Sequence, residues 1–314
     1  MTTTIATTNF LDKGADRLER GEDVAETMAG IFFVLNAMRQ YVSESTWKQF
    51  AAEECRQHPL MQLLRQDPLT SRAFTKPRGY AGDAVMMDMV YAAEDGYDLP
   101  EVERISELGR QIYEHQLQIP AAKAVRTRRH IICDKVDNLA IRTPRAHILS
   151  LACGHLREAY DCPALLEGRL GRYVAIDQDK ESLAVVEREV GPLGVETLAA
   201  SVRDVLKGSV TLTGFDLVYA TGLYDYLTEP VGRRLCEILF GMLNPGGRLL
   251  IANFLPGISS AGYMEAFMDW WLIYRTEAEL FRLAETLPEK QVETINLFVE
   301  ENRNIAFLEV SRKS

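Results

Sequence analysis

The second half of the chain alternates short apolar runs with stretches of helical periodicity, and this alternation limits the available folds more than any other feature. The runs cover residues 147–152, 173–176, 196–199, 217–219 and 248–253. Strands that alternate with helices predict a parallel sheet with helices on both faces. Two further runs, residues 292–299 and 305–310, are joined by a short polar turn and predict a C-terminal antiparallel hairpin.

The first half of the chain shows helical periodicity only. From Gly14 to Ala140, apolar residues recur every three or four positions, as they do between Val24 and Val42. Further helices are expected from Thr46, capped by Ser45, from Glu101 through Ile112, and from Ala121 to Leu139. Thr143-Pro144 disfavours helix and precedes the first apolar run. We therefore expect a helical domain over residues 1–143 and a sheet domain over residues 144–314.

Composition excludes several classes of protein. The chain has 314 residues and 47% hydrophobic content, enough for two ordinary domains, and its net charge of -10 opposes a nucleic-acid partner. The five cysteines show no CxxC or Cys/His spacing, so we expect no disulfide framework, no metal site and a cytoplasmic location. No apolar run approaches the roughly 18 residues that a membrane span needs, and the N-terminus does not resemble a signal peptide.

One segment indicates a ligand. Residues 148–158 read as a strand that enters a turn of small residues, and ligands of doubly wound sheets bind beyond the carboxyl ends of such strands. Asp177 ends the next predicted strand, roughly 20 residues further on, where a carboxylate can accept hydrogen bonds from both hydroxyls of a ribose. Together the two positions predict a ligand that contains adenosine.

From Arg145 to the C-terminus the sequence resembles the class I S-adenosylmethionine-dependent methyltransferases. The resemblance lies, in order, in Ala152-Cys153-Gly154, Asp177-Gln178, Arg203-Asp204-Val205, residues 215–224 and residues 243–249. It implies an α/β, Rossmann-like seven-stranded sheet, mostly parallel, with the C-terminal hairpin as strands six and seven and the helical half as an N-terminal cap. It also implies S-adenosylmethionine as cofactor, S-adenosylhomocysteine as product, and no metal.

The first motif departs from the pattern of that family. Ser150, Ala152 and Leu156 occupy the positions of its acid, first glycine and third glycine, so only Gly154 remains. We expect Glu158 to replace the missing acid. The cofactor-binding residues that the resemblance implies are Ser150, Ala152, Cys153, Gly154, Glu158, Asp177, Gln178, Asp204, Val205, Thr221 and Gly222.

A second, narrower resemblance reaches into the helical half. Residues 74–83 and 86–88, with residues 269–275, resemble the bacterial methyltransferases of 3-hydroxypalmitic acid methyl ester (extracellular factor) biosynthesis. The glycines that flank Tyr80-Ala81 and the proline before Arg78 predict a non-helical loop, which we interpret as a lid. The arginines at positions 126, 128 and 129 are interpreted as a solvated helix face, from which one side chain could reach an anion site.

Candidate acceptor-binding residues come from both halves of the chain. Tyr80, Tyr224 and Asp225 are the predicted catalytic residues. The predicted substrate-binding residues are Arg78, Asp83, Tyr226, Trp271 and Arg275, the last two expected to share one face of a helix. Converging arginines would favour a carboxylate acceptor, whereas the aspartates would favour an amine.

The sequence leaves several functions open. The leading hypothesis is a small-molecule methyltransferase that O-methylates a fatty or hydroxy acid. The alternatives are an N-methyltransferase of an amine or amino-acid-like metabolite and a non-catalytic regulator that binds S-adenosylmethionine. A nicotinamide-dependent oxidoreductase is disfavoured by the single glycine of the loop. The apolar faces of the helical half would allow a homodimer or could cover the sheet.

Overall fold

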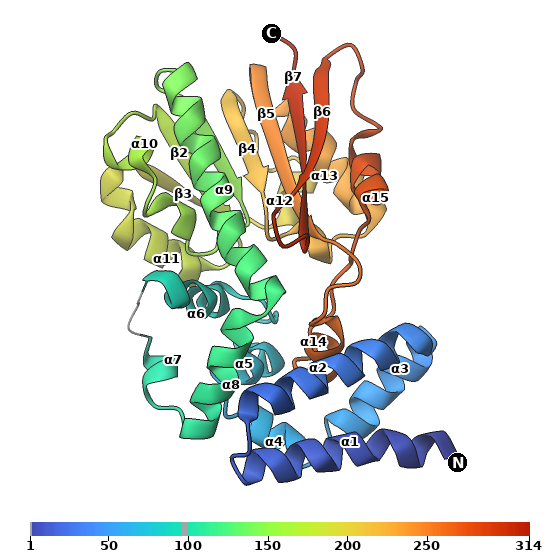
Figure 1. Cartoon of the computed structure of the whole chain (residues 1–314). Helices are drawn as coiled ribbons and strands as arrows, with labels where there is room; N and C mark the ends of the chain where they lie inside the picture. The colour runs from blue at the N-terminus through green and yellow to red at the C-terminus, as the bar shows by residue number, and fades with distance from the viewer. Residues whose placement is uncertain (1, 96–98) are drawn as a thin grey trace. The chain divides into compact units, whose positions relative to one another are not determined.

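The computed structural model of the protein describes residues 2–95 and 99–314 (Figure 1). It forms two compact units. A helical unit contains Met1–Lys123 and Gly257–Trp271, and a sheet unit contains Ala124–Pro256 and Leu272–Ser314. Residues 124–142 therefore group with the sheet and residues 257–271 with the helices. The sequence predicts a single division, between residues 143 and 144.

The helical unit confirms the reading of the first half as helix after helix over its described residues. Its α-helices are α1 (Thr2–Glu19), α2 (Val24–Tyr41), α3 (Glu44–Phe50), α4 (Leu60–Leu64), α5 (Pro68–Thr75), α6 (Ala84–Asp95), α7 (Pro100–Glu103), α8 (Glu107–Gln118) and α14 (Ala261–Phe267). A π-helical turn, Ala51–Cys55, follows α3 directly.

Two helix boundaries differ from the sequence-based expectation. Ser43, not Ser45, caps α3, because its Oγ accepts a hydrogen bond from the backbone N–H of Thr46. The helix expected from Glu101 through Ile112 is interrupted: α7 ends at Glu103 and α8 begins at Glu107. The Oγ of Ser106 accepts a hydrogen bond from the N–H of Gly109, and this cap stabilises the start of α8 at Glu107.

The segment 257–271 is an integral part of the helical unit. Every residue of α14 is buried, and a Cβ on Gly262 would lie 2.6 Å from the carbonyl carbon of Leu35 in α2, so only glycine fits this crossing. Tyr263 stacks on Phe32 with ring centroids 4.3 Å apart. The buried carboxylate of Glu265 accepts hydrogen bonds from Arg39 and from the indole of Trp47. Packing and charge pairing thus fix α14 against α2 and α3.

The sheet unit contains the seven predicted strands and their helices. The strands are β1 (His147–Leu151), β2 (Arg172–Asp177), β3 (Val195–Ala199), β4 (Phe215–Ala220), β5 (Leu243–Phe254), β6 (Val292–Val299) and β7 (Ile305–Arg312). The helices are α9 (Pro120–Arg142, whose first turn belongs to the other unit), α10 (Pro163–Leu166), α11 (Lys180–Glu189), α12 (Val202–Leu206), α13 (Glu229–Gly241) and α15 (Glu277–Phe281).

The strand order is β3-β2-β1-β4-β5-β7-β6. Strands β1 to β5 pair in parallel, and β7 runs antiparallel to both of its neighbours, β5 and β6. This arrangement confirms the expected fold class, a mostly parallel Rossmann-like sheet closed by a C-terminal hairpin. It is the strand arrangement that the resemblance to methyltransferases implies.

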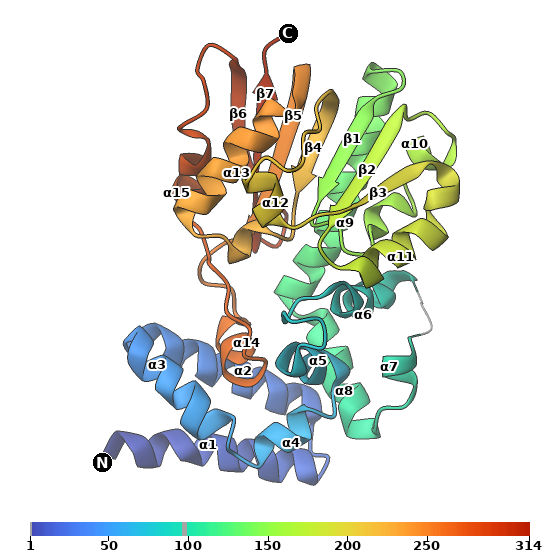
Figure 2. The same cartoon turned by 180° about the vertical axis from the view of Figure 1, so that it is seen from behind.

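The two faces of the sheet are both covered, which explains why its inner strands are continuous apolar runs. On one face, side chains such as Leu149, Val174 and Val218 pack with Leu235 and Leu239 of α13 in a single hydrophobic core. The alternate residues of the same strands point the other way. Helix α9 crosses the sheet in front in Figure 1, and α13 lies in front when the sheet is seen from behind in Figure 2.

No helix in the described part of the chain is both long and apolar enough to cross a membrane. This agrees with the expectation drawn from the apolar runs of the sequence.

Candidate functional site

The loops that follow β1, β2, β3 and β4 lie at one edge of the sheet, because parallel strands place their carboxyl ends together. From β1 the chain proceeds outward through β2 to β3 and then returns to place β4 on the other side of β1. The strand order therefore reverses between β1 and β4. In open α/β sheets, the crevice at such a reversal is where ligands bind.

The loop after β1 adopts a conformation that favours glycine. Ala152, Gly154 and Leu156 have φ angles of +55°, +55° and +52°, in the left-handed region. Ala152 and Leu156 occupy the positions where the resembled family carries its first and third glycines, and the backbone explains that preference. Each non-glycine residue held there costs about 1–2 kcal/mol, which the surrounding structure must offset. Burial of the Leu156 side chain contributes to that offset.

Asp177, at the end of β2, connects the first two loops of the edge. One of its carboxylate oxygens, Oδ2, accepts a hydrogen bond of 2.8 Å from the N–H of Gly154, and Oδ1 accepts one of 2.9 Å from the N–H of Asp179. Burial raises the pKa of this carboxyl, while the backbone hydrogen bonds oppose that rise. The adjacent Gln178 is exposed. The predicted pair thus places a buried acid beside an accessible side chain.

Glu158, the proposed replacement for the missing acid, is bound to β4. Its Oε1 accepts a hydrogen bond of 2.7 Å from the hydroxyl of Tyr219, whose oxygen lies 2.5 Å from that of Tyr173 on β2. Ser150 is buried next to this chain and hydrogen-bonds to Tyr219. Burial raises the pKa of Glu158, and Arg128 opposes the rise. Glu158 therefore lies at the candidate edge, inside a hydrogen-bonded network that sequence reasoning did not foresee.

The arginines of α9 correct another sequence-based interpretation. Arg126, Arg128 and Arg129 are buried rather than solvated, with at most 7% of each residue exposed. Nη1 of Arg128 donates a hydrogen bond of 2.6 Å to the carbonyl oxygen of Thr221, directly after β4. The sequence carries no local signal for this burial, because it arises where one face of α9 packs on the sheet. The positive charge that Arg128 places near Glu158 could therefore not be predicted from the sequence.

The remaining predicted cofactor residues take varied places. Asp204 forms a capping box with Ser201 at the start of α12, and hydrogen bonds from Ser201 lower the pKa of its carboxyl. Val205 is buried in the core of the sheet. Gly222 is exposed. The Cys153 side chain is partly buried, and burial raises the pKa of its thiol, so the sulfur stays protonated at neutral pH.

The loop after β4 contains three of the predicted acceptor residues, and two of them are buried. Tyr224 is fully buried, and among the described residues its hydroxyl has no hydrogen-bond partner. Oδ1 of Asp225 accepts a hydrogen bond of 2.7 Å from the N–H of Phe254, and burial raises the pKa of this carboxyl to about 6. Tyr226 is 39% exposed. Of the three, Tyr226 is the side chain most accessible to a ligand.

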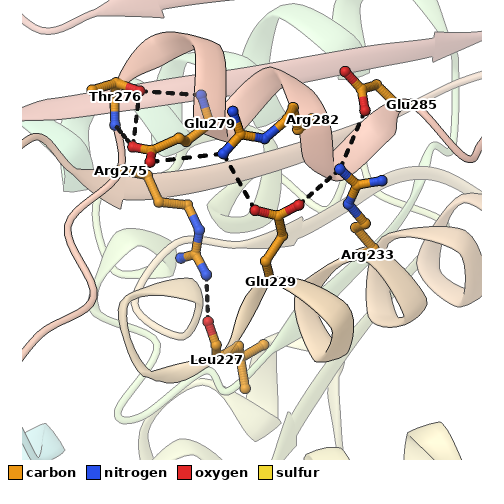
Figure 3. Close-up of polar contacts among 8 residues, drawn as sticks. All are labelled: Leu227, Glu229, Arg233, Arg275, Thr276, Glu279, Arg282 and Glu285. Carbon is orange, nitrogen blue, oxygen red and sulfur yellow. Dashed lines mark hydrogen bonds and ion pairs between the residues drawn. The ribbon is translucent and has the colours of Figure 1, made fainter.

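Arg275 holds this loop in place. Its Nη1 donates to the carbonyl oxygen of Tyr224 at 2.7 Å and to Oδ1 of Asn253 at 2.6 Å, and its Nη2 donates to the carbonyl oxygen of Leu227. Figure 3 shows the bond to Leu227. The residue is 3% exposed. Its guanidinium thus binds two backbone carbonyls and the Asn253 side chain of the protein itself, whereas the sequence predicts that it binds a substrate.

Figure 3 also shows a network of ion pairs next to Arg275. Arg282 contacts Glu229 and Glu279, and Arg233 joins Glu229 to Glu285. These side chains are a quarter to a half exposed, so the network contributes little to stability compared with the buried bonds of Arg275.

The loop between α5 and α6 belongs to the helical unit and is non-helical, as predicted. Lys76 and Gly79 have φ angles of +49° and +88°. Asp83 ends the loop fully buried: Nε of Arg72 donates to both of its oxygens, at 2.7 and 3.0 Å, and its Oδ1 also accepts from the N–H of Met86. The structure therefore gives Asp83 the role of an ion-paired helix cap. Arg78 and Tyr80 are partly exposed.

The expectation that Trp271 and Arg275 share a helical face is wrong. Helix α14 ends at Phe267, and residues 269–276 are not helical. Trp271 belongs to the helical unit and Arg275 to the sheet unit. Nε1 of Trp271 donates to Oδ1 of Asp269 at 2.9 Å, and Nζ of Lys48 lies 5.6 Å from the centre of its ring.

Comparison with known proteins supports the description of the fold. No protein-family model and no curated protein matches the chain. Among solved structures, a possible exported protein from Bordetella parapertussis matches with a TM-score of 0.62 and 16% identity, over 88% of this chain and 98% of that one. At this identity the match establishes the fold alone.

Two matches at lower TM-scores are methyltransferases. The N-methyltransferase NodS from Bradyrhizobium japonicum, in complex with S-adenosyl-L-homocysteine, has a TM-score of 0.43 and 16% identity, over 60% of this chain and 88% of that one. The S-adenosylmethionine-dependent methyltransferase SibL has a TM-score of 0.48 and 15% identity, over 81% of this chain and 75% of that one.

Proposed function

We propose that the protein is an S-adenosylmethionine-dependent methyltransferase that acts on a small molecule. The observation that carries the proposal is the hydrogen bond between Gly154 and Asp177, which brings the small-residue loop after β1 to the acid at the end of β2. A ligand can approach the backbone of this loop closely, and the neighbouring carboxylate can accept hydrogen bonds from the hydroxyls of a ribose. The arrangement therefore suits a ligand that contains adenosine. The reversal of strand order between β1 and β4 also supports the proposal, because ligands of open α/β sheets bind at such a reversal.

The residues of the edge fit the cofactor chemically. Asp177 would accept from the ribose hydroxyls, and the exposed Gln178 would lie against the adenine. Glu158, kept in place by Tyr219, would face the positively charged amino group of the methionine part. Bound S-adenosylmethionine supplies an electrophilic methyl group, and the protein's task is to align the acceptor with it and to exclude water.

Calorimetric titration with S-adenosylmethionine tests the proposal directly. The wild-type protein should bind, and Asp177→Asn should weaken binding about 10- to 150-fold, because hydrogen bonds to charged groups contribute about 1.5–3 kcal/mol. Glu196→Gln is the matched control: Glu196 lies on β3 and pairs with Arg172 on the surface, so its loss should leave affinity unchanged. Absence of binding by folded wild-type protein would exclude the function.

For the acceptor, we propose a carboxylate of a fatty or hydroxy acid, methylated on oxygen. A carboxylate needs no base, which suits an edge whose acid Asp225 is buried and bound to the backbone. Tyr226, the exposed tyrosine of the loop after β4, would orient the carboxylate.

Transfer of a labelled methyl group to a panel of hydroxy fatty acids and amines tests the choice of acceptor. Tyr226→Phe should raise KM for a carboxylate acceptor and leave the affinity for S-adenosylmethionine unchanged, whereas the exposed Tyr41→Phe should change neither. If the methyl group were transferred to amines only, the protein would be an N-methyltransferase. The proposed O-methylation would then be wrong, but the proposal of a methyltransferase would stand.

A non-catalytic regulator that binds S-adenosylmethionine is the second candidate. It is favoured by the burial of Tyr224 and Asp225, two of the three predicted catalytic residues. Binding without methyl transfer to any component of a metabolite extract would support it. Loss of methyl transfer in Tyr80→Phe with binding retained would exclude it, and the 88%-exposed Tyr41→Phe provides the control.

A further inference from the structure

Two cysteines that are distant in the sequence meet an aspartate in the sheet unit. Cys133 and Asp137 lie one turn apart on α9, and Cys162 immediately precedes α10. The two sulfur atoms and a carboxylate oxygen all lie within 4.8 Å of one another. Cys162 Sγ is 3.5 Å from Oδ1 of Asp137, and Cys133 Sγ is 3.8 Å from its Oδ2. The spacing of the cysteines in the sequence gives no hint of this cluster.

We propose that Cys133, Asp137 and Cys162 bind a thiophilic divalent cation of the zinc class. Zinc bonds to sulfur at about 2.3 Å and to carboxylate oxygen at about 2.0–2.2 Å, so the S···O edge of a tetrahedral site measures about 3.5 Å. The three ligand atoms of the cluster lie within 4.8 Å of one another, so movements of about 1 Å would bring the side chains around a cation.

The polar surroundings indicate which atoms would bind. The N–H of Ala164 donates to Oδ1 of Asp137 at 2.6 Å, and Nη2 of Arg169 lies 3.8 Å from the same oxygen. Oδ1 is thus already engaged, as the non-binding oxygen of a metal-bound carboxylate often is, and Oδ2 is left for the cation. A water molecule would complete four ligands.

The charges also favour a cation over a disulfide. A carboxylate next to two thiols opposes the thiolate on which disulfide exchange depends. The positive charge of a divalent cation would offset the repulsion between the carboxylate and the two thiolates, because all three groups would bind it. Binding would release the proton of each thiol to solvent and form two bonds between sulfur and metal.

Titration of the reduced protein with Co²⁺ tests the site without reference to activity. Thiolate ligands to cobalt give a charge-transfer band in the near ultraviolet, and Zn²⁺ should abolish the band by displacement. We expect saturation at one equivalent per chain. Removal of one ligand in Cys133→Ala or Cys162→Ala should weaken the affinity at least about tenfold and reduce the band. Asp137→Asn should weaken the affinity with the band retained.

Cys236→Ala and Cys55→Ala are the controls. Both thiols are buried elsewhere in the chain, and burial raises the pKa of each to about 12, so their loss should leave the cobalt band unchanged. Zn²⁺ should also raise the unfolding temperature of the wild type and not that of Cys133→Ala.

Three results would overturn the proposal. The first is the absence of a cobalt band on folded, reduced protein. The second is a band of wild-type intensity in the double variant Cys133→Ala/Cys162→Ala. The third is that Cys133 and Cys162 bind neither Co²⁺ nor Zn²⁺ but form a disulfide with each other when oxidised glutathione is added. Because Cys133 and Cys162 take no part in the proposed methyl transfer, failure here leaves that function untouched.

Discussion

Replacement of Arg275 distinguishes a structural from a substrate-binding role. Its guanidinium donates to the carbonyl oxygens of Tyr224 and Leu227 and to the side chain of Asn253. In Arg275→Met, the carbonyl oxygen of Leu227 and Oδ1 of Asn253 would lose their donor, at about 1–3 kcal/mol each, whereas the carbonyl oxygen of Tyr224 would keep its 3.2 Å bond from the N–H of Leu227. Part of this loss is offset, because the variant no longer has to bury a charged guanidinium in the folded state. We expect a net loss of about 2–4 kcal/mol, because two neutral acceptors stay without a donor.

Arg282→Gln is the matched control for this variant. Arg282 belongs to the neighbouring ion-pair network of Figure 3 and is 40% exposed, so its replacement should cost no more than about 1 kcal/mol. Both variants can be compared with the wild type by urea unfolding followed by circular dichroism. If Arg275→Met retained wild-type stability and only raised KM for an acceptor, the structural reasoning would be refuted and the substrate-binding role restored.

Three further predictions concern single side chains. Ala152→Gly should stabilise the protein by up to about 1 kcal/mol, measured by urea unfolding, because glycine accepts the φ of +55° without strain; a loss of stability would contradict this reading of the loop. Tyr224→Phe should be neutral or stabilising by up to about 2 kcal/mol, since it removes a buried hydroxyl with no partner among the described residues; lost methyl transfer at unchanged stability would instead indicate a catalytic hydroxyl. Burial raises the pKa of Asp67 to about 6 from 3.8, so the folded state binds the proton of this carboxyl more tightly than the unfolded state does. The contribution of Asp67 to the free energy of unfolding should therefore fall by about 3 kcal/mol between pH 4 and pH 6, and it should stay constant above pH 6. The difference in unfolding free energy between wild type and Asp67→Asn, measured across that range, checks the sign, and a difference independent of pH would refute it.

The inner strands could be predicted because burial on both faces makes them apolar. Residues 147–152 and 292–299 match β1 and β6 to within one residue. Their parallel order and the C-terminal hairpin follow from the helices and the turn between them. The end of β5 was likewise predicted to within one residue, but its start at Leu243 was not, because residues 243–247 read as a turn.

Helix ends were harder to predict than helices. Ser43 and Ser45 are both suitable caps for the helix that contains Trp47, and only the backbone decides between them. Glu44, the acid that follows Ser43 into the first turn, was the available signal. The break between α7 and α8 depends in the same way on the cap at Ser106.

For the candidate site, sequence reasoning found side chains but not their surroundings. The positions of Gly154 and Asp177 follow from strand ends, so the pair could be predicted. The burial of Arg128 and Arg275 could not, because polar residues are assigned to the surface unless a partner distant in the sequence is known. The meeting of Cys133 with Cys162 likewise depends on how α9 packs.

The helical unit includes a segment made late in synthesis. Its α14 follows β5 in the chain, so a ribosome completes five of the seven strands before Glu265 is available to pair with Arg39 and Trp47. Until then the first helices lack both that carboxylate and the ring of Tyr263 that stacks on Phe32. The N-terminal unit must therefore finish folding after most of the sheet has been synthesised, the reverse of the order in which successive domains usually mature.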